Sequence, residues 1–380
     1  MSRTSRLRRN APVTPYTGEV TRRRDTNARV AALLSDLAAV QKSQHSTWGY
    51  KRAAQAILDL DEPLESLLEP GGTLRKIPHV GPSSLRVIHE FLSSGRSGTV
   101  EGAIAESGKA SEVERSRELR GNFLSSAQVA EVLRFEANRG VGARHYRGDL
   151  QMHSEYSDGR VSIEGLVKGC LARGYRYCAI TDHSYGLPIA GGVSMADLKR
   201  QHAEINALNR KYKGRFRVIK GIEANILADG RLDMRPDELE KMELVLAAPH
   251  SKLRTGDDQT ARMLDAVRTP GVHILAHPRG RKSGSRPGIT ANWKRVFAAA
   301  AKANVAIEID GDPSRQDVDF ELAQQALAAG CLFALDSDAH SVDELRYADT
   351  ALAHARLAGI PKDRIINCWE TEDLLAWLAR

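Results

Sequence analysis

The sequence is poor in cysteine and has no long apolar run. Its four cysteines form no CxxC pair, which argues against a disulfide framework and against a cysteine-based zinc site. No stretch approaches the roughly 18 apolar residues of a membrane span, and the first residues lack the apolar core of a secretory signal. We therefore expect no contact with a membrane and a cytoplasmic location.

Acidic residues are scarce in the first thirty positions. Residues 1 to 30 hold eight arginines against Glu19 and Asp25, so this segment carries most of the formal net charge of +7. We expect residues 1–26 to form a basic, disordered arm, because so polar a segment cannot bury enough apolar surface to fold alone. Such an arm would attract a polyanion such as nucleic acid. A solvated tail or an organelle-targeting segment is the alternative.

The length of 380 residues indicates more than one domain. The pattern over residues 27–97 predicts a small helical domain, and a helical linker is expected over 98–144. Over residues 145–380, short apolar runs alternate with helical segments, which is the pattern of repeated β-α units around a parallel sheet. Seven of these runs are predicted to be strands, ending at His153, Thr181, Ala224, Pro249, Ala276, Asp310 and Asp336.

Each predicted strand ends beside a residue that can bind a metal ion. Because the carboxyl ends of parallel barrel strands open onto one face, side chains from distant positions would converge on one pocket. Imidazole and carboxylate without thiolate suit Zn²⁺, Mn²⁺ or Fe²⁺, and a bridging Glu223 would hold two neighbouring ions, the usual arrangement for hydrolysing phosphate esters. Some of these residues are expected to orient the ligands instead. The residues are His153 and Asp158, Asp182 and His183, Glu223, His250, His277, Glu308 and Asp310, and Asp338 and His340.

These residues lie in six short motifs. The first runs from Gly148 to Ser154 and on through Ser157-Asp158-Gly159, and the second is Thr181-Asp182-His183-Ser184. The others are Gly221-Ile222-Glu223, Pro249-His250-Ser251, Ala276-His277-Pro278 and Ser337-Asp338-Ala339-His340. In order and spacing they resemble the motifs of the polymerase and histidinol phosphatase (PHP) superfamily, from about Asp149 to the C-terminus.

This resemblance implies a distorted TIM-like (β/α)7 barrel that holds up to three divalent ions. One departure from the family pattern is Gln151, which stands where the first motif normally has His; it places the occupancy of the first ion in question. By the resemblance, one ion is held by His153, Glu223 and Asp338, a second by Glu223, His250 and His277, and a third by Asp158, His183 and His340.

Further residues are candidates for catalysis. Asp182, His183 and His340 are expected to orient groups or to pass a proton. The segment from Glu308 to Asp317 resembles the form of the superfamily that is attached to bacterial family X DNA polymerases, and its Arg315 is expected to grip a substrate phosphate. An Arg315–Asp317 ion pair is the alternative. Positive charge at the pocket rim is expected from Lys252, Arg254, Arg279 and Arg281.

The helical segment carries a second resemblance. Leu74 to Ile88 resembles a helix-hairpin-helix, in which a tight glycine turn lets the next helix point free backbone N–H groups at a DNA phosphate. His79 replaces a usual glycine, and a structural helical turn is the alternative. Trp48 to Ala54 resembles the small DNA-end-binding domain of family X polymerases. The expected DNA contacts are Lys76, Val80, Gly81, Ser83, Ser84 and Arg86.

No aspartate occurs between Asp61 and Asp149, so the paired aspartates of a polymerase palm cannot lie there and nucleotide addition is not expected. The sequence instead predicts a metal-dependent phosphoesterase acting on single-stranded DNA or 3′ ends, as a 3′–5′ exonuclease or 3′-phosphatase. One alternative is a phosphatase of the histidinol-phosphate type acting on a small phosphomonoester, which the barrel alone would equally support. Another is a non-catalytic DNA-binding accessory protein.

Overall fold

The structure is a computed structural model that describes residues 25–134, 140–283 and 285–379. The predicted basic arm therefore lies outside the described residues, except for its last two positions. Among the described residues, none of the helices combines the length and the apolar character that a membrane span requires.

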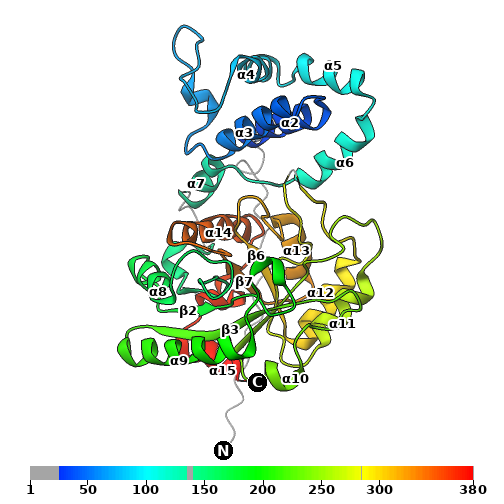
Figure 1. The fold of residues 1–380 in the computed structure, drawn as a ribbon. Helices are drawn as coiled ribbons and strands as arrows, with labels where there is room; N and C mark the ends of the chain where they lie inside the picture. Colours follow the sequence, from blue (N-terminus) through cyan, green and yellow to red (C-terminus); the bar gives the residue numbers. More distant parts are fainter. Residues whose placement is uncertain (1–24, 135–139, 284, 380) are drawn as a thin grey trace, which may run out of the picture.

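The first part of the chain is a helical region that sits above a barrel (Figure 1). Its first helix begins where the side chain of Asp25 accepts a hydrogen bond from the backbone N–H of Ala28, which caps the free end of the helix. Val30, Leu34 and Leu37 are buried on one face of this helix and pack against the following helices. The elements of the region are α2 (Thr26–Val40), α3 (Gln44–Leu58), η1 (Leu64–Leu67), α4 (Pro82–Ser94), α5 (Gly98–Ser107), α6 (Ala110–Arg120) and α7 (Ser126–Arg134).

The second part contains one seven-stranded sheet in the order β1 to β7, in which all neighbouring strands are parallel. A bridge between Met152 and Ala339 joins the first strand to the last, so the sheet closes into a barrel. The predicted (β/α)7 barrel behind a helical domain is thereby confirmed. The strands are β1 (Gly148–Asp149), β2 (Tyr177–Ile180), β3 (Arg217–Asn225), β4 (Leu244–Ala248), β5 (Ile274–Leu275), β6 (Ala306–Asp310) and β7 (Phe333–Asp336).

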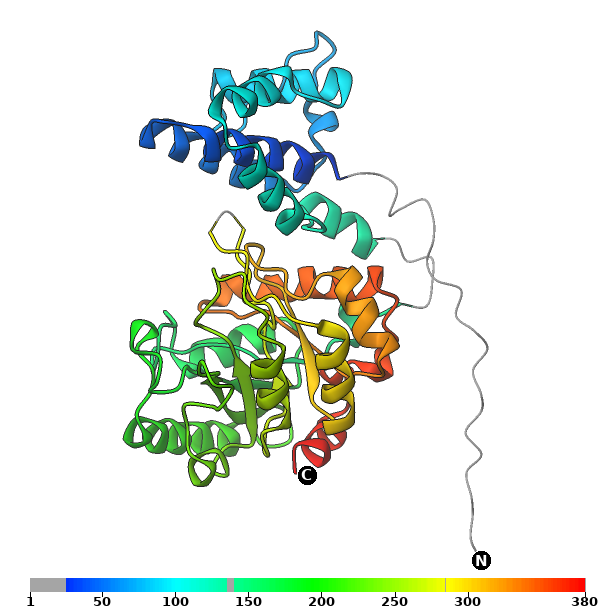
Figure 2. The same cartoon turned by 90° about the vertical axis from the view of Figure 1, so that its right-hand side faces the viewer.

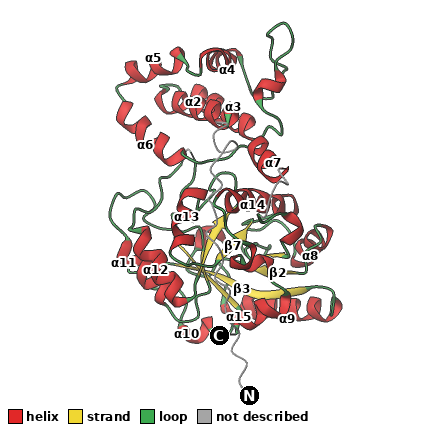
Figure 3. Cartoon of the chain, turned by 180° about the vertical axis from the view of Figure 1, so that it is seen from behind, coloured by secondary structure: helices red, strands yellow, loops and turns green. Residues whose placement is uncertain are grey.

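Helices surround the strands, as Figure 3 shows from behind. Most of them connect one strand to the next, as right-handed β-α units require, and α14 and α15 follow the last strand. Their bounds are α8 (Ile163–Ala172), α9 (Met195–Lys211), α10 (Pro236–Leu239), α11 (Thr260–Arg268), α12 (Trp293–Ala303), α13 (Phe320–Ala328), α14 (Ala348–Leu357) and α15 (Thr371–Leu378). Short 3-10 turns are η2 (Ala143–His145), η3 (Pro188–Ala190), η4 (Val342–Tyr347), η5 (Lys362–Arg364) and η6 (Ile366–Cys368).

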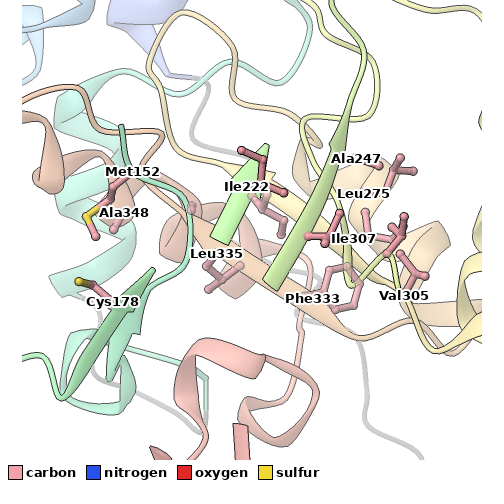
Figure 4. Packing of buried hydrophobic residues seen from close by; sticks show 14 of the residues in the cluster. Met152, Cys178, Ile222, Ala247, Leu275, Val305, Ile307, Phe333, Leu335 and Ala348 are labelled. Atoms are coloured by element: carbon pink, nitrogen blue, oxygen red, sulfur yellow. The ribbon is translucent and has the colours of Figure 1, made fainter. Parts of the chain in front are cut away.

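Both faces of the strands are buried. In β4, Leu244 and Leu246 belong to one apolar cluster while Val245 and Ala247 belong to another, as expected when a parallel sheet is covered on both sides. Figure 4 shows part of the larger cluster. Six of the seven predicted strand ends agree with the structure to within one residue; the exception is β1, which ends at Asp149, earlier than predicted.

The loops at the carboxyl ends of the strands face the helical region, and Figure 2 shows one of them rising toward it. Arg281 Nη1 donates a hydrogen bond to the backbone oxygen of Leu119 at 3.2 Å, and its guanidinium lies 4.3 Å from the ring centroid of Phe123. The amide of Gln316 pairs with both backbone groups of Leu124, at 2.8 and 2.9 Å. The helical region is therefore fastened to loops of the barrel.

Apolar packing joins the two parts as well. Val100, Ile104 and Val113, from α5 and α6, belong to the core of the helical region, whereas α7 packs against α14 of the barrel through residues such as Val129 and Leu357. The expected linker thus consists of helices that pack on one side or the other. Domain boundaries at residues 97 and 144 stay a proposal.

Candidate metal centre

Glu223 lies at the middle of the strand-end residues. This buried carboxylate, on β3, has its Oε2 atom 3.2 Å from Nε2 of His153 and 3.3 Å from Nδ1 of His183. Its Oε1 atom lies 3.2 Å from Nε2 of His250 and 3.3 Å from Nε2 of His277. Residues from four strand ends therefore meet around one carboxylate, as the barrel topology predicts.

Two aspartates complete the cluster. Asp338 Oδ1 is 3.0 Å from Nε2 of His153, and Asp158 Oδ1 is 3.3 Å from Nε2 of His340. Asp158 Oδ2 is also 3.6 Å from Nε2 of His183. The His153 ring stacks between the rings of His183 and His340, with centroids 4.4 Å apart on each side. All eight predicted metal ligands thus lie in one continuous cluster.

The ligand atoms fall into four groups that are each compact enough to hold an ion. One group is the first ligand set implied by the family resemblance, and another is the third set with His153 added. A further group differs from the second set, because His183 takes the place of His277 beside Glu223 and His250. His277 nevertheless lies 3.3 Å from Glu223. The groups are His153 with Glu223 and Asp338; His153 with Asp158, His183 and His340; His183 with Glu223 and His250; and His277 with Glu308 and Asp310.

The fourth group lies beside the predicted ligand set. Nδ1 of His277 is 3.2 Å from Oε2 of Glu308, which also accepts the backbone N–H of His277. Burial, and then the neighbouring carboxylates, raise the pKa of Glu308 and of Asp310 well above their usual values. A cation among these oxygens would relieve that repulsion. Both residues have the strand-end signal of the predicted ligands, yet the ligand set implied by the resemblance leaves them out.

The buried polar atoms of the cluster fit a bound cation. Both oxygens of Glu223, Nε2 of His250, Nε2 of His277 and Oδ2 of Asp338 are inaccessible to water and have no hydrogen-bond partner among the described residues. Such atoms are unfavourable in a protein interior unless another group satisfies them. Imidazole nitrogens and carboxylate oxygens are the ligands that Zn²⁺, Mn²⁺ and Fe²⁺ accept, so the donor set fits divalent metal ions.

The charges of the cluster favour metal binding. Burial opposes ionisation of Glu223, but the surrounding imidazoles outweigh it and hold the pKa of this carboxyl well below its usual value. Burial also opposes ionisation of Asp338, where the Arg315 guanidinium is the largest of the groups that lower the pKa. Burial lowers the pKa of His250 to about 4. The ring is therefore neutral near pH 7 and free to bind a metal.

Gln151 is fully buried, and neither atom of its side-chain amide has a hydrogen-bond partner among the described residues. It follows β1 and precedes His153 by two positions. The position at which the PHP pattern has His is therefore an inward-facing one, and here it offers an amide oxygen, a weak metal ligand.

Asp182 does not point at the other ligands. Its carboxylate accepts hydrogen bonds from the backbone N–H and hydroxyl of Ser154, at 2.7 and 2.6 Å, from the hydroxyl of Ser157 at 2.5 Å and from the amide of Gln201 at 2.6 Å. These donors fix the loop that carries Asp158. Of the two roles expected for Asp182, orienting other groups fits these contacts.

Arg315 points into the cluster. Its Nη1 atom is 3.0 Å from Asp338 and 3.6 Å from Asp310. The alternative pair with Asp317 is wrong, because Asp317 binds Arg279 at 2.8 Å.

The expectation of positive charge at the rim fails for two residues. Arg279 is paired with Asp317 and Asp319, each at 2.8 Å, and Arg281 is buried beneath the helical region. Contacts within the protein therefore engage both guanidinium groups, and neither adds positive charge to the rim. Lys252 and Arg254 are exposed, as a rim position requires.

The predicted DNA contacts lie at the start of α4, far along the chain from the metal centre. Gly81 caps this helix without a side-chain hydrogen bond and Pro82 follows, so backbone N–H groups of the first turn are free for an anion. His79 adopts a left-handed backbone with φ 64°, the conformation that a glycine would take easily. Of the predicted contacts, Lys76, Gly81, Ser83 and Arg86 are exposed, Val80 is half-buried and Ser84 is buried.

Asn225 is a site residue that the sequence did not reveal. It ends β3, and its Oδ1 atom lies 3.3 Å from Nδ1 of His250, which orients the other ring nitrogen toward Glu223. Its place at a strand end is the available signal, but an uncharged amide lacks the carboxylate or imidazole that marks a strong metal ligand.

Comparisons with known proteins agree with the two resemblances. Residues 25–97 match the helix-hairpin-helix domain family and residues 149–261 match the PHP domain family, which confirms both. The DNA polymerase/3′-5′ exonuclease PolX of Bacillus subtilis is 36% identical over 235 residues, which are 62% of this chain and 41% of that protein. A probable phosphatase of Shewanella frigidimarina is 32% identical over 219 residues, which are 54% of this chain and 82% of that protein.

Among solved structures, a histidinol phosphate phosphatase from Lactococcus lactis, complexed with zinc, L-histidinol and phosphate, covers 55% of this chain and 94% of its own. Its sequence identity is 18% and its TM-score is 0.43. So low a score says nothing about substrate.

Proposed function

The chain belongs to the PHP-domain family of metal-dependent phosphoesterases, and we propose that it hydrolyses phosphate esters at nucleic-acid ends, as a 3′–5′ exonuclease or a 3′-phosphatase. The observation that carries the proposal is the cluster of imidazoles and carboxylates around Glu223 on the barrel face that looks toward a helix-hairpin-helix region. We propose up to three divalent ions there, Zn²⁺, Mn²⁺ or Fe²⁺. When bound, such ions polarise phosphate oxygens and lower the pKa of water from about 15.7 to roughly 7.

The side chains of the protein then bind and orient the ester. Arg315, held by Asp338 and Asp310, presents a planar guanidinium on which two oxygens of a phosphate group can be bound side by side. Asp182 keeps the loop of Asp158 in place through its serine contacts. His340 is the most exposed imidazole of the cluster, with 19% of its side chain accessible, so it is the ring best placed to exchange a proton with the substrate.

Two features favour a nucleic-acid end over a small phosphomonoester. The free N–H groups at the start of α4 provide a phosphate site outside the barrel, and the helical region covers the loops around the metal centre. A small-molecule phosphatase needs neither. The PolX polymerase/exonuclease of Bacillus subtilis is matched over 41% of its length. Its exonuclease activity therefore supports this proposal without establishing it.

The test compares hydrolysis of a 3′-labelled single-stranded oligonucleotide with that of a small phosphomonoester, each with Mn²⁺. We expect the native chain to shorten the oligonucleotide or to release its 3′-phosphate. His250→Ala should lose this activity by a factor of more than about 100, because removing a residue that merely orients a metal ligand already costs about 10- to 100-fold. His202→Ala, on α9 away from the cluster, is the matched control and should remain active.

The outcomes separate the alternatives. Hydrolysis of the monoester alone would favour the small-molecule phosphatase. Absence of activity from the native chain on every ester, with oligonucleotide binding retained, would favour the non-catalytic accessory protein. Salt gives a second criterion, because binding through several phosphates weakens steeply as the salt concentration rises.

A further inference from the structure

A cavity of about 390 Å³ lies between the helical region and the barrel. One wall comes from α2, α3 and α6, which contribute Ser35, Thr47, Lys51 and Arg120. The opposite wall is the loop after β5, which contributes Lys282 and Arg286. The cavity is therefore distinct from the metal centre and from the start of α4, and it exists only because the two parts of the chain are docked.

The lining of the cavity carries positive charge and contains no carboxylate. Arg120 is partly neutralised, because it shares the buried carboxylate of Asp36 with a second arginine. Lys51, Lys282 and Arg286 form no ion pair with any carboxylate in the part of the chain that the structure describes. Cations without a carboxylate partner that face one another across a cavity repel and favour a bound anion.

The cavity is connected to the metal centre through two loops. The backbone N–H of Ser283 donates to the backbone oxygen of Ser314 at 2.7 Å, and Nε of Arg281 donates to the backbone oxygen of Arg315 at 2.9 Å. The loop that lines the cavity therefore rests on the loop whose Arg315 reaches Asp338. After burial, the charge of Arg315 is the largest of the effects that lower the pKa of Arg286. Positive charge thus runs from the cavity to the cluster.

An exposed aromatic ring lies beside the cavity. Trp48 is 56% exposed, so its ring is available for contact with a ligand. It neighbours Thr47 on α3, and Nζ of Lys51 lies 5.6 Å from the centroid of its ring. Aromatic rings next to a basic groove bind single strands by stacking on their bases, independently of sequence.

We propose that this cavity binds the sugar-phosphate backbone of a single-stranded nucleic acid whose 3′ end lies at the metal centre. The inference rests on the proposed function, and it adds the route that the strand takes from the cavity to the metal centre. The volume is at the lower end of the roughly 300–1,000 Å³ of ligand pockets, which suits one strand better than a duplex. Lys51, Lys282 and Arg286 bind phosphates, and Trp48 stacks on a base.

The test measures binding of a 5′-fluorescein-labelled oligothymidylate of about 15 nucleotides by fluorescence anisotropy, with EDTA present so that no hydrolysis occurs. The variant is Lys51→Ala/Lys282→Ala in the full chain. Each lost phosphate contact lowers the slope of log affinity against log salt by about 0.7 and the affinity at 0.1 M salt by about fivefold. We therefore expect the double variant to bind about 25-fold more weakly, with a slope lower by about 1.4.

The matched control is Lys199→Ala/Lys213→Ala, which removes the same charge from exposed positions on and after α9. It should bind as the native chain does. Quenching of tryptophan fluorescence by unlabelled oligothymidylate is a second readout, and Trp48→Phe should remove most of it. The proposal is overturned if the double variant has the same affinity and the same salt slope as the control.

Hydrolysis of bis(p-nitrophenyl) phosphate by the native chain with Mn²⁺ separates the two proposals. This diester is too small to span from the cavity to the cluster. If the native chain hydrolyses it but the double variant binds oligothymidylate normally, the path is wrong and the phosphoesterase stands. If the native chain hydrolyses no ester while the double variant loses affinity, the binding site stands and the proposed function fails.

Discussion

Replacing Glu223 by Gln tests whether one carboxylate joins the metal sites. The substitution keeps the shape of the side chain and removes one negative charge. Both oxygens of Glu223 are buried and lie 3.2 to 3.3 Å from nitrogens of four imidazoles. If these four contacts mark shared ligands, every ion held near Glu223 should lose affinity at once.

The size of the effect follows from the charge removed. Two unit charges 4 Å apart at an effective dielectric constant of 20 interact by about 4 kcal/mol, which corresponds to about a thousandfold in affinity. At a free metal concentration 100 times its dissociation constant, the native chain gains about 2.7 kcal/mol of stability, or roughly 5–10 °C in melting temperature. Glu223→Gln at the same concentration would gain less than about 0.1 kcal/mol.

The assay is thermal unfolding followed by circular dichroism, with EDTA or with Mn²⁺, together with metal analysis of the purified chains. Glu243→Gln is the control: it removes the same charge from the amino end of β4, where Glu243 pairs with Arg217. The control should keep the metal-induced rise in melting temperature. The reasoning is refuted if Glu223→Gln retains the metal content and the metal-induced stabilisation of the native chain.

Two further predictions concern the joint between barrel and helical region. His354 is buried, accepts the backbone N–H of Phe320 and contacts Gln316, and burial lowers its pKa from 6.5 to about 3. Because the unfolded chain binds this proton first, the stability contributed by neutral His354 is complete above pH 6.5 and falls by about 1.4 kcal/mol per unit below it; urea unfolding at pH 7 and 5.5 should show a loss about 1.3 kcal/mol smaller for His354→Gln, and equal losses would contradict it. Arg281→Met removes hydrogen bonds to three backbone oxygens and should lower the free energy of unfolding by about 3 kcal/mol or more, against an unchanged value for Arg231→Met, whose side chain is 80% exposed.

The barrel and the convergence of its candidate ligands were predictable because both depend on short-range sequence patterns. A buried parallel strand is a continuous apolar run, and the first polar residue after it marks its end, so β4 and its His250 were located to within one residue. The first strand was harder, because only Gly148 and Asp149 pair as a ladder. Beyond them the chain crosses toward β7, where Met152 pairs with Ala339, and no local pattern encodes that crossing.

The roles of the arginines were not predictable, because they depend on contacts between distant loops. Arg281 follows a strand end and has the sequence signature of a rim charge. It is buried because the helical region docks over it and supplies the backbone oxygen of Leu119, 162 positions away. For Arg315, the nearby Asp317 is the partner that the sequence suggests. In the structure Asp317 forms an ion pair with Arg279, and Arg315 contacts Asp338 instead.

A barrel with these ligands can accept any phosphate ester that reaches it, since a fold does not choose a substrate. Selection must therefore come from what surrounds the ligands. Here the amide of Gln316 holds the backbone of Leu124, and Gln316 is the neighbour of Arg315, which contacts Asp338 at 3.0 Å. The helical region cannot move without straining the loop that carries Arg315. If the substrate binds the helical region as we propose, its position and the geometry at the metal centre are set by the same few residues.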